Sequence, residues 1–121
     1  PEDMTHLEAA GITDDFTMGY ADVAGFRLGT SYPVRWINPV TRRLSSILLH
    51  PLTIMDCTLE EKKYMGLNYE EALAYSLNLI EQVKNTGGEL TLLWHNTSAQ
   101  ENTDSYLRKL YSHLLNELAK K

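Results

Sequence analysis

The sequence has little cysteine, little positive charge and no long hydrophobic run. Cys57 is the single cysteine among 121 residues, so no internal disulfide is possible, and we expect a reducing, cytoplasmic environment. Lysine and arginine number 11 against 16 aspartate and glutamate, a formal net charge of −5. This excludes the basic face of a nucleic-acid binder. No stretch approaches the ~20 apolar residues of a membrane span, so we expect no membrane-spanning segment.

The composition is that of one ordinary globular domain. Hydrophobic residues make up 43% and charged residues 22% of the chain, and a chain of this length can bury a sizeable core. No internal repeat, low-complexity tract or linker divides it, so residues 1–121 are expected to form a single domain. Because the chain opens on Pro1 rather than methionine, we expect it to be a piece of a longer protein.

The spacing of apolar residues predicts alternating strands and helices. The most strongly marked helix begins with Asn68 and Glu71, which match a capping box, and ends at two glycines. The segment after Pro51 is predicted to be the stronger part of its strand, because proline lacks an N–H. The expected elements are helices over residues 1–11, 68–88 and 103–121, strands over 12–18, 34–37, 45–55 and 89–95, and a loop over 21–33. This order indicates right-handed parallel crossovers in an α/β sheet.

Two polar residues stand at the ends of strands in this scheme. Asp56 ends the strand segment 52–56, and His95 ends the strand 89–95. Catalytic groups of parallel α/β folds gather at the carboxyl ends of strands, and a carboxylate beside an imidazole fixes its tautomer and readies it to donate a proton. The spacing leaves a second interpretation equally open, in which His95 bonds a backbone carbonyl and Asp56 caps the next turn.

Three segments in order resemble a known family. "AGITDDFTMGYADVAGFRLGT" (10–30), "PLTIMDCTL" (51–59) and "GGELTLLWHN" (87–96) are similar to the later half of polysaccharide deacetylase-like proteins, carbohydrate esterase family 4. The resemblance implies a (β/α) barrel that hydrolyses N- or O-acetyl groups on sugars with a divalent metal. We therefore expect an α/β fold, a partial (β/α) barrel of mostly parallel strands with flanking helices, lacking the N-terminal half.

The resemblance also implies roles for single residues. His95 is implied as the general acid that protonates the leaving amine or alkoxide, with Asp56 as its orienting partner. Arg27 is implied to pair with the family's catalytic-base aspartate and to orient it. These three residues are the catalytic candidates.

Three further residues are candidates for binding substrate. The resemblance implies that Leu93 and Trp94 line an acetyl or sugar pocket. Asp22, in the "GYAD" segment, is a candidate for lining the same site, and an Asx-turn in the loop is the alternative.

The family's two metal-binding motifs have no counterpart in this chain. Asp14-Asp15 lacks the preceding apolar strand and following glycine of the first motif, and the four histidines lack the close spacing of two ligands on one helix face. We therefore expect no metal site or other cofactor here, and a divalent metal, zinc, in the full-length parent. His50-Pro51 is interpreted as structural, and Cys57 as a small buried residue.

Two functions follow as hypotheses. In the first, the chain is the C-terminal part of a metal-dependent carbohydrate deacetylase, whose parent is a hydrolase while the isolated chain is inactive. In the second, it is a non-catalytic carbohydrate-binding or structural module on a degenerate deacetylase scaffold. A carbohydrate is the expected partner in both. Because a half-barrel leaves strand edges unpaired, we also expect self-association or pairing with the missing N-terminal half.

Overall fold

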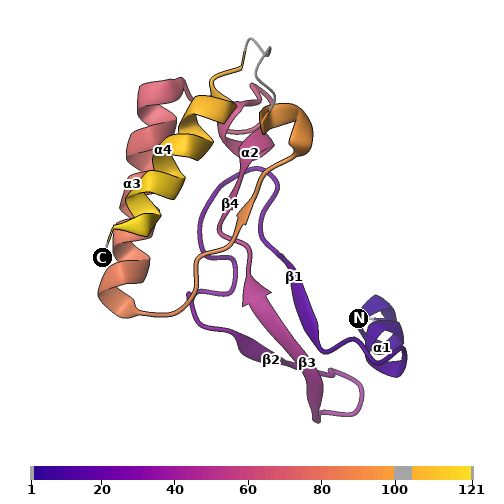
Figure 1. Cartoon of the computed structure of the whole chain (residues 1–121). Coiled ribbons are helices and arrows are strands. Elements are labelled where there is room, and N and C mark those ends of the chain that lie inside the picture. The colour runs from indigo at the N-terminus through magenta and orange to yellow at the C-terminus, as the bar shows by residue number, and fades with distance from the viewer. Residues whose placement is uncertain (1, 100–104, 121) are drawn as a thin grey trace.

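Two separate sheets organise the residues that the computed structural model describes, 2–99 and 105–120 (Figure 1). In chain order the elements are α1 (Glu2–Ala9), β1 (Asp14–Met18), β2 (Val34–Ile37), β3 (Leu44–Pro51), β4 (Ile54–Met55), α2 (Asp56–Glu60), α3 (Tyr69–Thr86), β5 (Leu92–Leu93), the 3-10 helix η1 (Asn96–Ala99) and α4 (Leu107–Ala119). Strand β3 lies between β1 and β2 in a three-stranded sheet. Strands β4 and β5 form a second, parallel pair.

The expected partial (β/α) barrel is wrong. The three-stranded sheet is mixed, because β1 runs parallel to β3 while β2 runs antiparallel to it, and no closed barrel forms within the described residues. A tight turn rather than a helix joins β2 to β3. In that turn Asn38 Oδ1 accepts the amides of Val40 (2.9 Å) and Thr41 (3.2 Å), and Arg42 adopts a φ of 58°. A connection this short can join only antiparallel neighbours.

The crossover from β4 through α3 to β5 confirms the predicted parallel neighbours. Helix α3 begins with the predicted capping box, in which the side chain of Asn68 accepts the Glu71 amide and Glu71 accepts the Asn68 amide. It ends at Gly87, whose φ is 80°. At Gly88 an added Cβ would lie 2.7 Å from the carbonyl oxygen of Ser31, so only glycine lets the chain pass the 21–33 loop toward β5.

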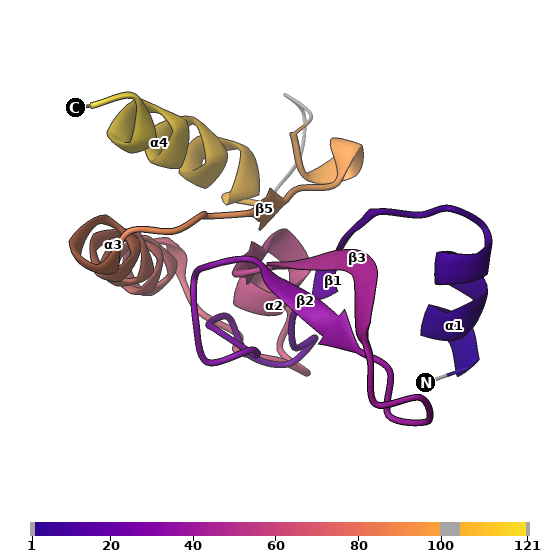
Figure 2. The ribbon, with the colours of Figure 1, turned by 90° about the horizontal axis from the view of Figure 1, so that it is seen from below.

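The hydrophobic core lies between the helices and the β4–β5 pair. Helices α3 and α4 lie side by side, and the three-stranded sheet and α1 extend away from them (Figure 1, Figure 2). No helix in the described part of the chain has both the length and the apolar character needed to cross a bilayer. The buried apolar cluster contains Ala24, Ile54, Leu59, Ala72, Leu79, Ile80, Leu107, Leu110 and Leu114.

The predicted strands differ from the observed ones near Pro51. Strand β3 is the longer one and ends at Pro51, so the prediction that the segment after Pro51 is stronger was wrong. Because Pro51 is the last residue of β3, its missing N–H interrupts nothing, and the next amide, that of Leu52, donates to the Met18 carbonyl (3.2 Å). The expected strand 89–95 is regular only over β5, and α2 was not expected at all.

Replacement of Leu110 tests the packing of the hydrophobic core. It is fully buried on α4, whereas Leu115 on the same helix is 45% exposed. Replacing Leu110 by alanine should lower the free energy of unfolding by about 2–5 kcal/mol, because it leaves a cavity among packed side chains. Urea denaturation measures the loss, with Leu115→Ala as the matched control expected to cost less than about 1 kcal/mol. Equal losses for both variants would contradict this packing.

Candidate functional site

The parallel pair β4–β5 brings a carboxylate and an imidazole together. Ile54 pairs with Leu92 and Met55 with Leu93, so the residues that follow each strand leave the sheet at the same edge. Asp56 follows β4 directly as the first residue of α2, and His95 comes two positions after β5. The predicted approach of Asp56 and His95 is therefore confirmed.

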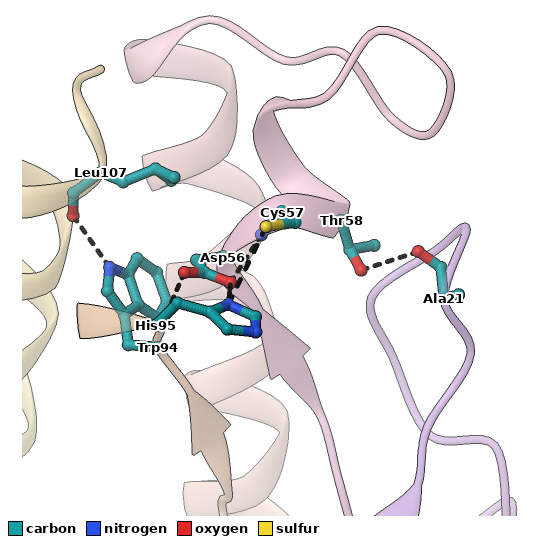
Figure 3. Close-up of polar contacts among 7 residues, drawn as sticks. All are labelled: Ala21, Asp56, Cys57, Thr58, Trp94, His95 and Leu107. Carbon is teal, nitrogen blue, oxygen red and sulfur yellow. Dashed lines mark hydrogen bonds and ion pairs between the residues drawn. The ribbon is translucent and has the colours of Figure 1, made fainter. Parts of the chain in front are cut away.

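Asp56 and His95 are joined by two hydrogen bonds (Figure 3). The ring Nδ1 of His95 lies 2.7 Å from Asp56 Oδ1, and the backbone amide of His95 donates to Asp56 Oδ2 over 2.8 Å. Asp56 Oδ1 also accepts the amide of the next residue, Cys57 (2.7 Å). Asp56 is the first residue of α2 and Met55 is its N-cap, with no side-chain capping bond, so the interpretation of Asp56 as a cap is not borne out. Because a carboxylate only accepts, Nδ1 carries the proton of its bond and the tautomer of His95 is fixed.

The two partners differ in their contact with water. The side chain of Asp56 has no exposed surface, while that of His95 is 48% exposed. Burial by itself raises the pKa of the Asp56 carboxyl, but hydrogen bonds from Ser98, the His95 amide and ring and the Cys57 amide outweigh it, and hold the pKa below its ordinary value. Asp56 is therefore a buried, ionised anchor, and the edge of the His95 ring that carries Nε2 is directed away from it (Figure 3).

Ser98 is a part of this site that the sequence analysis missed. Its hydroxyl hydrogen-bonds Asp56, and its amide donates to the His95 carbonyl over 3.0 Å. The only signal in the sequence is a serine three positions after a strand-end histidine, a spacing that a single turn brings back onto the strand end.

Cys57 lies beside the pair, and its thiol is partly buried. Its Sγ is 3.9 Å from His95 Nδ1. Burial, together with the charges of Asp56 and Glu61, raises the pKa of the Cys57 thiol to about 11. The thiol keeps its proton at neutral pH, and thiolate chemistry is not available to it.

Asp56, Cys57 and His95 are also the group of described residues whose possible metal ligands converge, all within 4.8 Å of one another. These donor types suit zinc. The distances do not, because Nδ1 and Oδ1 are 2.7 Å apart, whereas two ligands of a tetrahedral zinc lie more than about 3 Å apart. The geometry is that of a hydrogen-bonded pair, and we assign no metal to it.

The predicted substrate-binding residues of β5 lie apart from one another. Trp94 turns toward α4, where its Nε1 donates to the Leu107 carbonyl over 3.1 Å (Figure 3). The Trp94 ring also lies 5.4 Å from the ring of Tyr111. Its contacts therefore support the strand. Leu93 is 41% exposed, so it is accessible to a ligand on the surface.

The structure does not bring Arg27 to the pair. The guanidinium of Arg27 donates to the Gly19 carbonyl (3.1 Å) and lies 5.4 Å from the ring centre of Tyr20. Asp22 is exposed in the same loop. That loop is tied to α2 next to the site, because Thr58 Oγ1 donates to the Ala21 carbonyl over 2.8 Å (Figure 3). Asp22 thus directly follows the residue that bonds to α2, and Arg27 contacts its own loop.

No family model, curated protein or solved structure matches the chain. The chemistry of the site therefore rests on its own geometry.

The buried carboxylate predicts a pH-dependent stability. Asp56→Asn should lower the free energy of unfolding at neutral pH by at least about 1–3 kcal/mol, because an amide cannot accept from all four donors. Since the folded pKa is lowered, the contribution of ionised Asp56 is complete above the unfolded value of about 3.9 and is lost as the pH falls through the folded one. The gap between wild type and variant should therefore narrow in acid.

Urea denaturation at a series of pH values measures this gap. The control is Asp22→Asn, an exposed aspartate whose replacement should change stability little at any pH. A gap that stays constant down to strong acid would show that Asp56 is not ionised in the folded protein.

Proposed function

We propose that this chain supplies the general acid of a carbohydrate deacetylase, with His95 as the proton donor and Asp56 as the residue that orients it. The observation that carries the proposal is the 2.7 Å bond between Nδ1 of a half-exposed histidine and a fully buried carboxylate. A buried, ionised partner fixes one edge of the ring and leaves the Nε2 edge for a substrate. The resemblance of three ordered segments to polysaccharide deacetylase-like proteins supplies the reaction class.

His95 supplies the proton that the leaving group takes, and Asp56 stabilises the charge on His95 before the transfer. In the reactive state both nitrogens of His95 carry protons, with Nδ1–H donating to Asp56. When the bond between the acyl carbon and the leaving nitrogen or oxygen breaks, the leaving atom keeps the electron pair and takes the proton from Nε2. His95 is then neutral and regains its proton from water. Asp56 stays ionised throughout and stabilises the charged ring.

The proposal assigns the remaining chemistry to residues outside this sequence. A divalent metal, zinc in the resemblance, would polarise the acetyl carbonyl and activate water, and its ligands and the catalytic base would belong to the full-length parent. Within this chain, exposed Leu93 and Asp22 are proposed to contact the sugar, and Arg27 to act only once the base is present. The isolated chain is then inactive. Its free thiol suits a cytoplasmic location.

His95 provides the test in the full-length protein. His95→Ala should lower kcat by roughly 10²–10⁴-fold, the usual contribution of one general acid, while KM changes little because the proton is needed only as the leaving group departs. Release of acetate from an N-acetylated chito-oligosaccharide measures both constants. Asp56→Asn should give a smaller loss in the same direction.

The matched control is His6→Ala, an exposed histidine on α1. If His95→Ala keeps full turnover, the general-acid role is wrong. If the full-length protein binds the oligosaccharide but releases no acetate, the alternative of a non-catalytic carbohydrate-binding module takes its place.

We also propose that the chain associates with a second copy or with the missing half of its parent. Strands β1 and β2 are the edges of their sheet, and unpaired edges favour pairing with another chain. Apolar side chains are exposed on and beside these strands: Phe16 at 49%, Ile37 at 59%, Val40 at 84% and Leu44 at 67%.

Light scattering on the isolated chain tests this association. We expect a dimer that Ile37→Lys converts to a monomer, because a lysine on an edge strand opposes pairing. Leu118→Lys, a change at a 37% exposed leucine on α4, is the control and should leave the dimer intact. A wild-type chain that stays monomeric at high concentration would contradict the proposal.

A further inference from the structure

A second carboxylate–imidazole contact lies at the other end of the strands that carry the site. Segments 50–56 and 89–95 run in parallel, and β4 and β5 are their paired middle parts. Where the pairing begins, the amides of Thr53 (3.1 Å) and Ile54 (3.3 Å) both donate to the Thr91 carbonyl. At the start of the same two segments, His50 Nδ1 lies 2.7 Å from Glu89 Oε2. His50 precedes Asp56 by as many residues as Glu89 precedes His95.

His50 is held on both sides. Its Nε2 lies 2.7 Å from Asp14 Oδ1, on the neighbouring strand β1. Ionised carboxylates only accept hydrogen bonds, so donating to both at once requires a proton on each ring nitrogen, which is the imidazolium form of His50. The ring of Phe16 stacks on it, with centroids 4.2 Å apart and planes 9° apart. The His50 side chain is 10% exposed.

The charged groups around His50 favour this state. Hydrogen bonds to Glu89 and then to Asp14 raise the pKa of His50, against the opposing effect of burial. In return the bond to His50 lowers the pKa of Asp14. Among the described residues, these two carboxylates, one from β1 and one from the segment before β5, are the titratable groups that shift the pKa of His50. Arg35 on β2 is directed instead to the Ser45 carbonyl (3.4 Å).

We propose that His50 is a positioning residue for the Asp56–His95 pair: clamped between Asp14 and Glu89, it sets the register in which segments 50–56 and 89–95 lie side by side. Register needs such a clamp here, because β4 and β5 are only two residues long and a slip by one residue would turn every side chain to the other face. The catalytic consequence of this positioning rests on the proposed function, whereas the register itself does not.

Amide hydrogen exchange in the isolated chain tests the register directly. The informative amides are those of Thr53, Ile54 and His95, since each bonds across the two segments. In His50→Gln we expect their protection to fall by roughly tenfold, the effect of losing charge-assisted bonds to half-exposed carboxylates. Glu89→Gln is a milder second variant that removes one charge. The matched controls are His6→Gln and Glu81→Gln, both exposed and on other elements.

The pH dependence of amide protection distinguishes the bonds of His50 to Asp14 and Glu89 from ordinary packing of the His50 side chain. Because the folded pKa of His50 is raised, its contribution is complete below the unfolded value of about 6.5 and is lost as the pH rises through the folded one. After correction for the intrinsic exchange rate, protection of the three amides in the wild type should therefore fall toward alkaline pH. In His50→Gln it should stay flat across the same range.

Each outcome decides the proposal. Unchanged protection in His50→Gln overturns it, and so does an equal loss at the core amides of Ile80 and Val83 in α3, which would indicate a general loss of stability. If the His50→Gln chain does not fold, the same measurement on Glu89→Gln decides between these outcomes. If the amides respond as expected but His95→Ala keeps full turnover, the proposed function fails while the positioning by His50 stands.

Discussion

The buried carboxylate of Asp56 is the constraint on which the C-terminal half of the structure depends. An ionised group without exposed surface is tolerated only where donors replace its water. Here the donors come from three elements: the Cys57 amide from α2, the amide and ring of His95 after β5, and the Ser98 hydroxyl from η1. One arrangement of these elements satisfies them together, so the charge specifies how the crossover closes. Because the His95 ring is one of these donors, its Nδ1 edge is held against Asp56.

The two histidines that contact carboxylates, His50 and His95, differ in how far they are buried. His50 is covered and bonded at both nitrogens, so its proton is held and it has no open edge for a substrate. His95 is bonded to Asp56 at one nitrogen and is half exposed, and it is the second nitrogen that the proposed function uses for proton transfer. The order is also reversed, since the imidazole belongs to the first segment at one end and to the second segment at the other. In the two proposals made above, similar contacts on one strand pair have a structural role at the His50 end and a chemical role at the His95 end.

The sequence predicted those features whose causes are local. The capping box of Asn68 and Glu71 marks the start of α3, and the strand-end positions of Asp56 and His95 predicted their contact. The prediction of a partial barrel failed because the direction of a strand depends on its connection to the next one. The short turn between β2 and β3 permits only an antiparallel pair. The resemblance of three segments did not reveal the direction of these strands. His50 was interpreted as structural without its partners, because Asp14 and Glu89 are distant in sequence and only the fold brings them to the ring.

The two carboxylate–imidazole contacts span the same length of chain. His50 and Glu89 are 39 residues apart, and so are Asp56 and His95. Each contact closes a loop of the chain, and the two loops largely overlap. Once one contact has formed, closing the second loop therefore loses little further chain entropy. Helix α3, rich in local contacts, can form before either closure. During synthesis on a ribosome Asp56 emerges well ahead of His95, and its carboxylate remains solvated until the later strand arrives. Both contacts become possible together when the two segments meet, because each needs the same 39-residue span of chain to close.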